Sequence, residues 1–199
     1  MHVGLMGYAR SGKDTAGEYL TREHGYRRVS FADPLREAAW EIDPYISVNA
    51  WPEFARRLSD KVAGPNSWER VKDEYPEVRR FLQTLGQSIR NLDEDFWVRQ
   101  ALKRVDEVEA LALPAVVTDV RYPNEVTALR RRGFHLIYVD RPGTGPVNGH
   151  VSESAVSSTD ADETVSNDGT VADFYTRVEV AWQRIYDRNS RRHYGRSYE

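Results

Sequence analysis

The chain has 199 residues, of which 40% are hydrophobic and 30% charged, and its formal net charge at pH 7 is -3. This length and composition are typical of one globular domain, residues 1–199, and exclude a disordered chain. A negative net charge disfavours nucleic acid as a partner, because proteins that bind it carry a basic surface. The sequence contains no cysteine, which excludes disulfides and thiolate metal sites.

The first residues lack the charged and then apolar segments of a signal peptide, and no apolar run reaches the length of a membrane span. We therefore expect no membrane partner and a cytoplasmic location.

Apolar periodicity divides the chain into alternating strands and helices. Short apolar runs predict five strands, at residues 3–6, 26–31, 115–120, 134–140 and 163–166. Apolar positions three and four apart predict helices after the first strand, from about residue 33 to 41, over 78–89, 98–108 and 123–132, and from Thr170 onward. The alternation predicts an α/β fold with a mainly parallel sheet.

The segment between the second and third predicted strands is unusually long and reads as mostly helical. We expect a core at residues 1–33 and 114–187, with residues 34–113 as a helical substrate-binding insertion near the strand ends. Residues 188–199 are polar and are expected to form a flexible tail.

The turn after the first predicted strand matches a phosphate-binding loop. It reads Gly7-Tyr8-Ala9-Arg10-Ser11-Gly12-Lys13 and opens a helix. Glycines let the backbone N–H groups face phosphate oxygens, and the helix N-terminus adds partial positive charge. Lysine at the seventh position reaches the β- and γ-phosphates of ATP. The pattern therefore predicts ATP binding by Gly7, Arg10, Ser11, Gly12 and Lys13.

The position after Lys13 departs from the general pattern, which has Ser or Thr there to hold magnesium. This chain has Asp14, followed by Thr15. A carboxylate beside a triphosphate is repelled unless a cation lies between them. We expect Asp14 to act on Mg²⁺, directly or through water, and Thr15 to donate to a phosphate oxygen.

A second acid, Asp119, ends the predicted strand at residues 115–120, and Arg121 follows it. An acid in this place can hold the magnesium shell or order the acceptor. Taken alone, a capping role for Asp119 is an equal alternative. Beside a phosphate loop, the role at the reacting centre is favoured.

Arginine suits bidentate recognition of phosphate, so several arginines are candidates. Arg80 lies three residues from Gln83 and can share a helix face with it, and Arg90 follows on the same helix. Arg141 directly follows a strand, at the rim where ligands bind. Arginines 130–132 close a helix, where cations complement the helix dipole.

Short motifs occur in a fixed order at residues 7–15, 31–35, 79–86, 95–98, 119–121, 141–143, 150–153 and 167–170. They resemble those of the phage-type deoxynucleoside monophosphate kinases, and the unusual Asp14 is part of the match. The resemblance extends from residue 1 to about 186, with residues 45–75 only loosely covered.

The resemblance implies a P-loop nucleoside-monophosphate-kinase fold with a five-stranded parallel sheet flanked by helices. It implies transfer of the γ-phosphoryl group of ATP to a deoxynucleoside 5′-monophosphate, with Mg²⁺, in the host cytoplasm if a phage encodes the chain. A homodimer is compatible with it, because dimers occur in the family.

Roles for individual residues follow from the same resemblance. Lys13, Asp119 and Arg121 would be catalytic, and Asp14 and Asp119 would hold the metal. ATP would be bound by Gly12, Lys13, Asp14, Thr15, Arg141, Asn167 and Gly169, the last two near adenine. The acceptor would be bound by Asp33, Arg80, Gln83, Arg90, Trp97, Arg121 and Glu153.

Two alternatives remain open. The Ser-Gly-Lys-Asp segment and the Asp-x-Arg pair are also similar to phosphomevalonate kinases of the animal type, so phosphomevalonate or dephospho-coenzyme A is an alternative acceptor. A nucleotide-binding switch or scaffold without acceptor turnover is the other. A phosphate acceptor is largely ionised near pH 7, because its second pKa is about 6, so no general base is expected.

Overall fold

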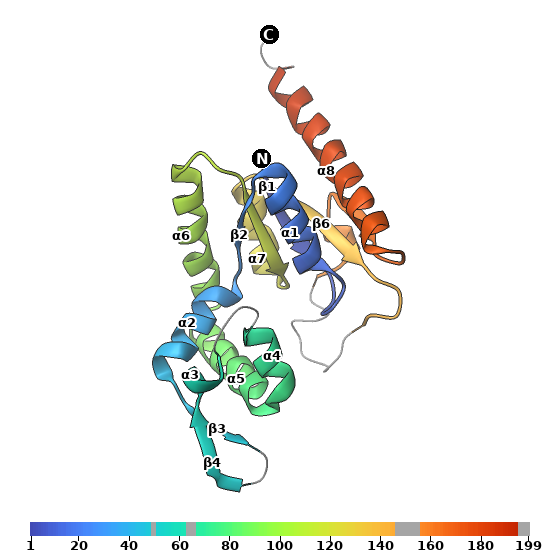
Figure 1. Cartoon of the computed structure of the whole chain (residues 1–199). Helices are drawn as coiled ribbons and strands as arrows, with labels where there is room; N and C mark the ends of the chain where they lie inside the picture. Colours follow the sequence, from blue (N-terminus) through green and yellow to red (C-terminus); the bar gives the residue numbers. More distant parts are fainter. Residues whose placement is uncertain (49–50, 63–66, 146–155, 195–199) are drawn as a thin grey trace. The chain divides into compact units, whose positions relative to one another are not determined.

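The computed structural model describes residues 1–48, 51–62, 67–145 and 156–194 (Figure 1). The chain divides into two compact units, which we call the sheet unit (Met1–Phe31 and Ala101–Glu199) and the inserted unit (Ala32–Gln100). From the sequence we expected the inserted unit to end near residue 113, whereas in the structure it ends at Gln100, inside the helix at Phe96–Ala110. Within the described residues, no helix is both long and apolar enough to cross a membrane.

The sheet unit contains a five-stranded parallel sheet, which confirms the predicted α/β fold. Its strands, in spatial order, are β2 (Arg27–Val29), β5 (Ala115–Val120), β1 (His2–Met6), β6 (Phe134–Asp140) and β7 (Glu163–Ser166). All five strands are parallel, so their carboxyl ends meet at one edge of the sheet. Ligands of open parallel sheets bind at this edge.

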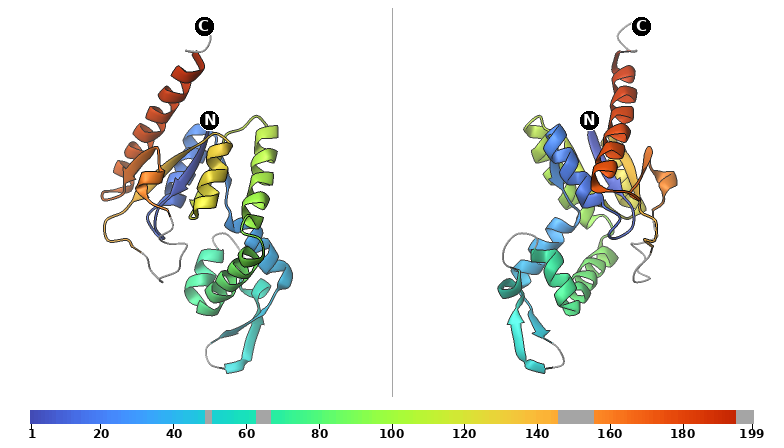
Figure 2. Two further views of the ribbon diagram at one scale, coloured as in Figure 1. Left: turned by 180° about the vertical axis from the view of Figure 1, so that it is seen from behind. Right: turned by 45° about the vertical axis from the view of Figure 1, so that its right-hand side comes forward.

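Helices cover both faces of this sheet. Helices α1 (Lys13–His24) and α8 (Val171–Tyr194) cover one face, where their apolar side chains share a core with β1 and β6. Helix α7 (Pro123–Arg131) lies on the other face, as the view from behind shows in Figure 2. A methyl group on Gly4 would come within 3.2 Å of Leu129 of α7, so helix and strand pack closely there.

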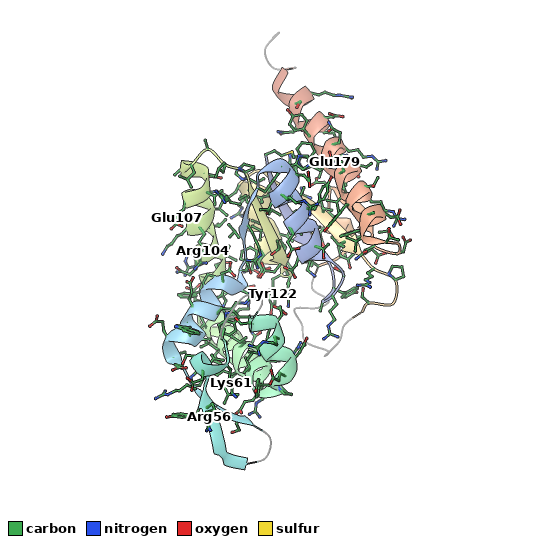
Figure 3. All side chains as sticks on the ribbon, in the orientation of Figure 1. Arg56, Lys61, Arg104, Glu107, Tyr122 and Glu179 are labelled. Carbon is green, nitrogen blue, oxygen red and sulfur yellow. The ribbon has the colours of Figure 1, made fainter. Side chains whose placement is uncertain are left out.

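Helix α8 continues to Tyr194, beyond residue 187 where the sequence suggested a frayed tail. Polar contacts join it to α1: Tyr19 Oη donates to Glu179 Oε2 at 2.9 Å, and His24 Nε2 lies 2.7 Å from the same oxygen (Figure 3). The His24 ring also stacks on Trp182 with ring centroids 3.7 Å apart. Aromatic and charged residues therefore attach the middle of α8 to α1.

The inserted unit has its own core, formed by seven buried residues that include Ile46, Leu58, Val71 and Leu82. Its helices are α2 (Ala32–Ile42), α3 (Leu58–Lys61), α4 (Ser67–Glu74) and α5 (Pro76–Leu92), and α6 (Phe96–Ala110) begins within it. The helices expected at residues 78–89 and 98–108 are thereby confirmed. The small 3-10 helix η2 (Ser158–Asp160) belongs to the sheet unit.

The expectation of a mostly helical insertion was wrong at one place. Strands β3 (Tyr45–Val48) and β4 (Trp51–Arg57) pair as an antiparallel hairpin. Asp43, with a positive φ of 45°, ends α2, and Pro44 cannot continue the helix. The Asp43 carboxylate accepts hydrogen bonds from Ser59 N and Oγ, at 2.8 and 3.0 Å, which ties the two ends of the hairpin together.

Candidate active site

The phosphate loop lies between β1 and α1, as its motif predicts. Gly7 and Gly12 have φ angles of 134° and 109°, which only glycine adopts without strain. A methyl group on Gly7 would lie 2.3 Å from the Val139 carbonyl oxygen, so the loop backbone packs directly against β6. Gly12 is the N-cap of α1, so the amino end of this helix faces the loop.

Lys13 is buried, with 6% of its surface exposed. Its Nζ donates to the carbonyl oxygens of Gly7 at 2.8 Å and Tyr8 at 2.6 Å. The ammonium group is therefore held across the loop by neutral acceptors. A phosphate oxygen is a stronger partner for an ammonium group than a carbonyl, so an entering anion can attract it away from them.

Ser11 is fully buried, and its Oγ has no hydrogen-bond partner among the described residues. An unsatisfied buried hydroxyl costs roughly 1–3 kcal/mol. The loop therefore holds a donor that an oxyanion could satisfy. This feature fits a phosphate ligand, which offers several acceptor oxygens.

Arg10 and Arg141 meet at the rim of the loop. Arg10 has a positive φ of 63°, unusual for a residue with a side chain. Arg141, which follows β6, donates from Nη1 to the Arg10 carbonyl at 3.3 Å. Both side chains are exposed, so two cationic groups border the loop. This placement agrees with the expectation for Arg141 without testing its role.

Asp14 and Thr15 occupy the first turn of α1. Asp14 is exposed and Thr15 is half-buried. The partial positive charge of a helix N-terminus favours a carboxylate there. Within the described residues, no group of three or more His, Asp or Glu side chains could hold a metal ion. A carboxylate such as that of Asp14 is a type of ligand that Mg²⁺ takes, together with phosphate oxygens and water.

Asp119 lies near the end of β5, where its carboxylate contacts the neighbouring strand. Ser30 Oγ donates to Oδ2 at 2.6 Å, and the Phe31 N–H donates to Oδ1 at 2.8 Å. The Asp119 carboxylate thus anchors the two residues that follow β2, and its role at a reacting centre stays a prediction.

Arg121 follows β5, and its side chain is exposed. Its backbone N–H donates to Glu125 Oε2 at 2.7 Å, and the Tyr122 N–H donates to the same oxygen at 3.0 Å. Glu125 is buried and caps the first turn of α7. Figure 3 draws Tyr122 directly after β5. The backbone of Arg121 is therefore fixed while its guanidinium group remains accessible.

Asn167 follows β7 and contacts the phosphate loop. Its Nδ2 donates to the Ser11 carbonyl oxygen at 2.8 Å, and its backbone N–H donates to the Asp140 carbonyl at 2.7 Å. Gly169 lies two residues further, beside Asp173. The structure shows a direct bond from Asn167 to the loop backbone, and the place near adenine that the resemblance implied stays a prediction.

The residues expected to bind the acceptor belong to the inserted unit. Arg80, Gln83 and Arg90 share one side of α5, because three- and four-residue steps return to the same helix face. Arg80 lies 3.5 Å from Glu77, and Arg90 donates to the Glu94 carbonyl at 3.4 Å. These three side chains are exposed or half-buried and are thus accessible to a ligand.

The other acceptor-side expectations have different outcomes. Asp33, in the first turn of α2, forms an ion pair of 3.3 Å with Arg36. Trp97 is buried to 5% exposure, and its Nε1 donates to the Gly86 carbonyl at 3.1 Å. Trp97 therefore packs between α6 and α5, and its role toward the acceptor stays a prediction. Glu153 lies outside the described residues.

The sequence reasoning missed one residue of the candidate site, Ser30, and one buried residue beside that site, Thr118. Ser30 orients Asp119, and Thr118 carries a buried Oγ1 that has no hydrogen-bond partner among the described residues. Ser30 lies near the end of the second predicted strand, and the carboxyl ends of neighbouring parallel strands meet at one edge. That rule could have pointed to Ser30. We know of no sequence pattern that would have singled out Thr118.

Comparisons with known proteins agree with this geometry. The family model described as deoxynucleotide monophosphate kinase matches residues 58–178. The chain is 30% identical to the deoxynucleotide monophosphate kinase of Escherichia phage RB69, over 89% of this chain and 97% of that protein. It is 37% identical to the uncharacterized protein ORF77 of Ictalurid herpesvirus 1, where the match covers 54% of this chain but only 49% of that protein.

Among solved structures, the dephospho-CoA kinase from Campylobacter jejuni resembles the fold. The TM-score is 0.50 at 11% identity, and the match covers 94% of this chain and 98% of that one. At this identity the similarity concerns the fold alone.

Proposed function

Because the chain belongs to the deoxynucleotide monophosphate kinase family, we propose that it transfers the γ-phosphoryl group of ATP to a deoxynucleoside 5′-monophosphate. The products are ADP and the deoxynucleoside diphosphate. Membership of this family makes the chain an ATP-dependent nucleotide kinase, which is a phosphotransferase. The deoxynucleoside acceptor and the roles of individual residues are the proposal.

The phosphate loop is the observation that carries the proposal. It combines Lys13 Nζ within 2.8 Å of two loop carbonyls, the buried and unpartnered hydroxyl of Ser11, and the amino end of α1. Each of these groups is a hydrogen-bond donor or a positive charge that an anion with several oxygens can bind. The tail of a nucleoside triphosphate offers such oxygens in a row.

The proposed reaction is an in-line displacement at the γ-phosphorus. An oxygen of the acceptor phosphate forms a bond to this phosphorus, and the bond to the oxygen bridging the β- and γ-phosphates breaks. The bond electrons leave with ADP. Because the acceptor phosphate is largely a dianion near pH 7, no proton must be removed first. The chain therefore needs no general base.

The main obstacle is repulsion between two anions. Lys13 would neutralise the β- and γ-phosphates, and the exposed guanidinium of Arg121 would neutralise charge that develops on the transferred group. Removal of one such donor typically lowers kcat by about 10²–10³. The fixed backbone of Arg121 supports this role, because it lowers the entropy lost when the side chain binds.

Magnesium is part of the proposal, with Asp14 and Asp119 as the residues that would hold it, directly or through water. Held there, Mg²⁺ would supply positive charge that offsets the negative charge of the phosphates. On the acceptor side we propose Arg80, Gln83 and Arg90, which present hydrogen-bond donors along one side of α5. The homodimer suggested by the sequence stays a prediction.

A coupled assay of ADP release tests the acceptor. The purified chain is incubated with ATP and Mg²⁺ and with each deoxynucleoside or ribonucleoside monophosphate, phosphomevalonate or dephospho-coenzyme A. We expect ADP release that depends on at least one deoxynucleoside monophosphate and that exceeds release without acceptor by more than about a hundredfold, or 2.7 kcal/mol. Turnover with phosphomevalonate or dephospho-coenzyme A alone would contradict the proposal.

A further inference from the structure

The Asn167 side chain is built into the phosphate loop. Its Nδ2 lies 2.8 Å from the Ser11 carbonyl oxygen, although the two residues are 156 positions apart. A methyl group on Gly12 would lie 2.5 Å from the same Nδ2 and 3.5 Å from the Phe174 ring. The side chain therefore fills the space directly beside the Ser11–Gly12 peptide.

The segment that carries Asn167 is itself fixed. Its backbone N–H donates to the Asp140 carbonyl at 2.7 Å, beside the pairing of Asp140 with Ser166 between β6 and β7. Arg177 of α8 donates to the Ser166 carbonyl at 3.0 Å and also pairs with Asp168. The backbone on both sides of Asn167 is thus fixed, so the Asn167 amide can fix the orientation of the loop backbone.

The geometry of a peptide bond gives this contact a consequence. In a planar trans peptide the C=O and N–H groups point in opposite directions. Asn167 holds the Ser11 carbonyl toward itself, so the N–H of Gly12 in the same peptide must point away from Asn167. Rotation of this peptide would redirect the N–H. The Asn167 amide therefore selects one orientation of a loop donor.

We infer that Asn167 is a positioning residue for the phosphate loop, which acts through the Ser11 carbonyl and not by contact with adenine. Without this bond, the Ser11–Gly12 peptide samples other orientations, and the loop binds a polyphosphate less tightly. The inference rests on the proposed function only in that the loop binds a triphosphate tail.

Binding measurements without any acceptor separate the two roles. We would measure the affinity of the full chain for MgATP and for inorganic tripolyphosphate with Mg²⁺ by calorimetry. The variants are Asn167→Ala, and Asn167→Leu, which keeps a similar side-chain size but has no donor. The matched control is Gln183→Ala, which removes an amide donor that lies 2.8 Å from Asp187 on α8.

Both Asn167 variants should bind ATP and tripolyphosphate about tenfold more weakly, by the same factor for each ligand, as expected for a lost hydrogen bond of about 1.4 kcal/mol. The control should bind as the unaltered chain does. In turnover assays, KM for ATP should rise more than KM for the acceptor.

Weaker binding of ATP alone would assign Asn167 to adenine and overturn the inference. A lower melting temperature with unchanged affinities would show a merely structural role and overturn it too. An unaltered chain that binds neither ligand would refute the proposed function and the inference together. If the chain binds both ligands yet phosphorylates no acceptor, the proposed function fails while the inference remains supported by the variants.

Discussion

Ser30 Oγ donates a hydrogen bond of 2.6 Å to Asp119 Oδ2, which joins the carboxyl ends of β2 and β5. Ser30 is 1% exposed, so water does not compete for this bond. A hydrogen bond to a charged group contributes about 1.5–3 kcal/mol. We predict that Ser30→Ala lowers the free energy of unfolding by about this amount and lowers kcat about tenfold, because Asp119 then rotates more freely. Urea unfolding and steady-state kinetics measure the two effects.

Thr118→Val is the matched control, since it also removes one buried hydroxyl beside Asp119. The Thr118 Oγ1 has no hydrogen-bond partner among the described residues. Its removal should leave kcat within about twofold and stabilise the chain slightly, because the desolvation cost of the hydroxyl disappears. Equal losses of kcat in both variants would contradict the positioning role of Ser30.

The sequence predicted the sheet unit well because its signals are local. The phosphate loop is one continuous motif between a strand and a helix, and the parallel strands are short apolar runs bounded by turns. The hairpin of β3 and β4 was missed, although Asp43 and Pro44 are residues that favour a turn. The predicted helices on both sides led us to interpret this segment as helical as well.

The contacts within the candidate site were less predictable. Ser30 and Asp119 are 89 positions apart, and Asn167 and Ser11 are 156 apart. Periodicity reports which face of an element is buried, but not which polar groups meet across the fold. The exposed stripe of Arg80 and Gln83 was predicted correctly as a shared helix face, since that relationship lies within α5.

Lys13→Met should lower kcat by at least about a hundredfold, since it removes the ammonium group that would neutralise the transferred phosphate. Lys13 is buried, and methionine has an apolar side chain of similar length, so the variant should fit in the same space. The measurement is kcat together with the melting temperature. Lys103→Met, at an exposed position of α6, serves as the control. A loss of kcat below about tenfold would exclude Lys13 from the reacting centre.

Asp14→Asn should raise the Mg²⁺ concentration needed for half-maximal rate by about tenfold, which corresponds to about 1.4 kcal/mol. The amide keeps the shape of the side chain but removes the negative charge that attracts the cation. Initial rates over a range of Mg²⁺ at saturating ATP give the midpoint. Glu18→Gln removes the same charge one helical turn further along α1, where Glu18 is also exposed. Equal midpoints for the two variants would show that Asp14 has no special role.

His135 on β6 should make the fold less stable in mild acid. Burial lowers the pKa of His135 below 6.5, and this effect exceeds the opposite effect of Asp162, whose carboxylate lies 3.9 Å away. The unfolded chain therefore binds the proton more readily than the folded chain. The contribution of neutral His135 to the free energy of unfolding is fully present above pH 6.5. This contribution is lost as the pH falls from 6.5 through the lowered pKa of the folded chain. Urea unfolding at pH 7.5, 6.5 and 5.5 should show a smaller loss of the free energy of unfolding for His135→Gln than for the unaltered chain.

Burial also lowers the pKa of His2. In the double variant His2→Gln/His135→Gln, the free energy of unfolding should therefore depend still less on pH. Identical slopes for all three proteins would mean that these histidines titrate alike in the folded and unfolded states.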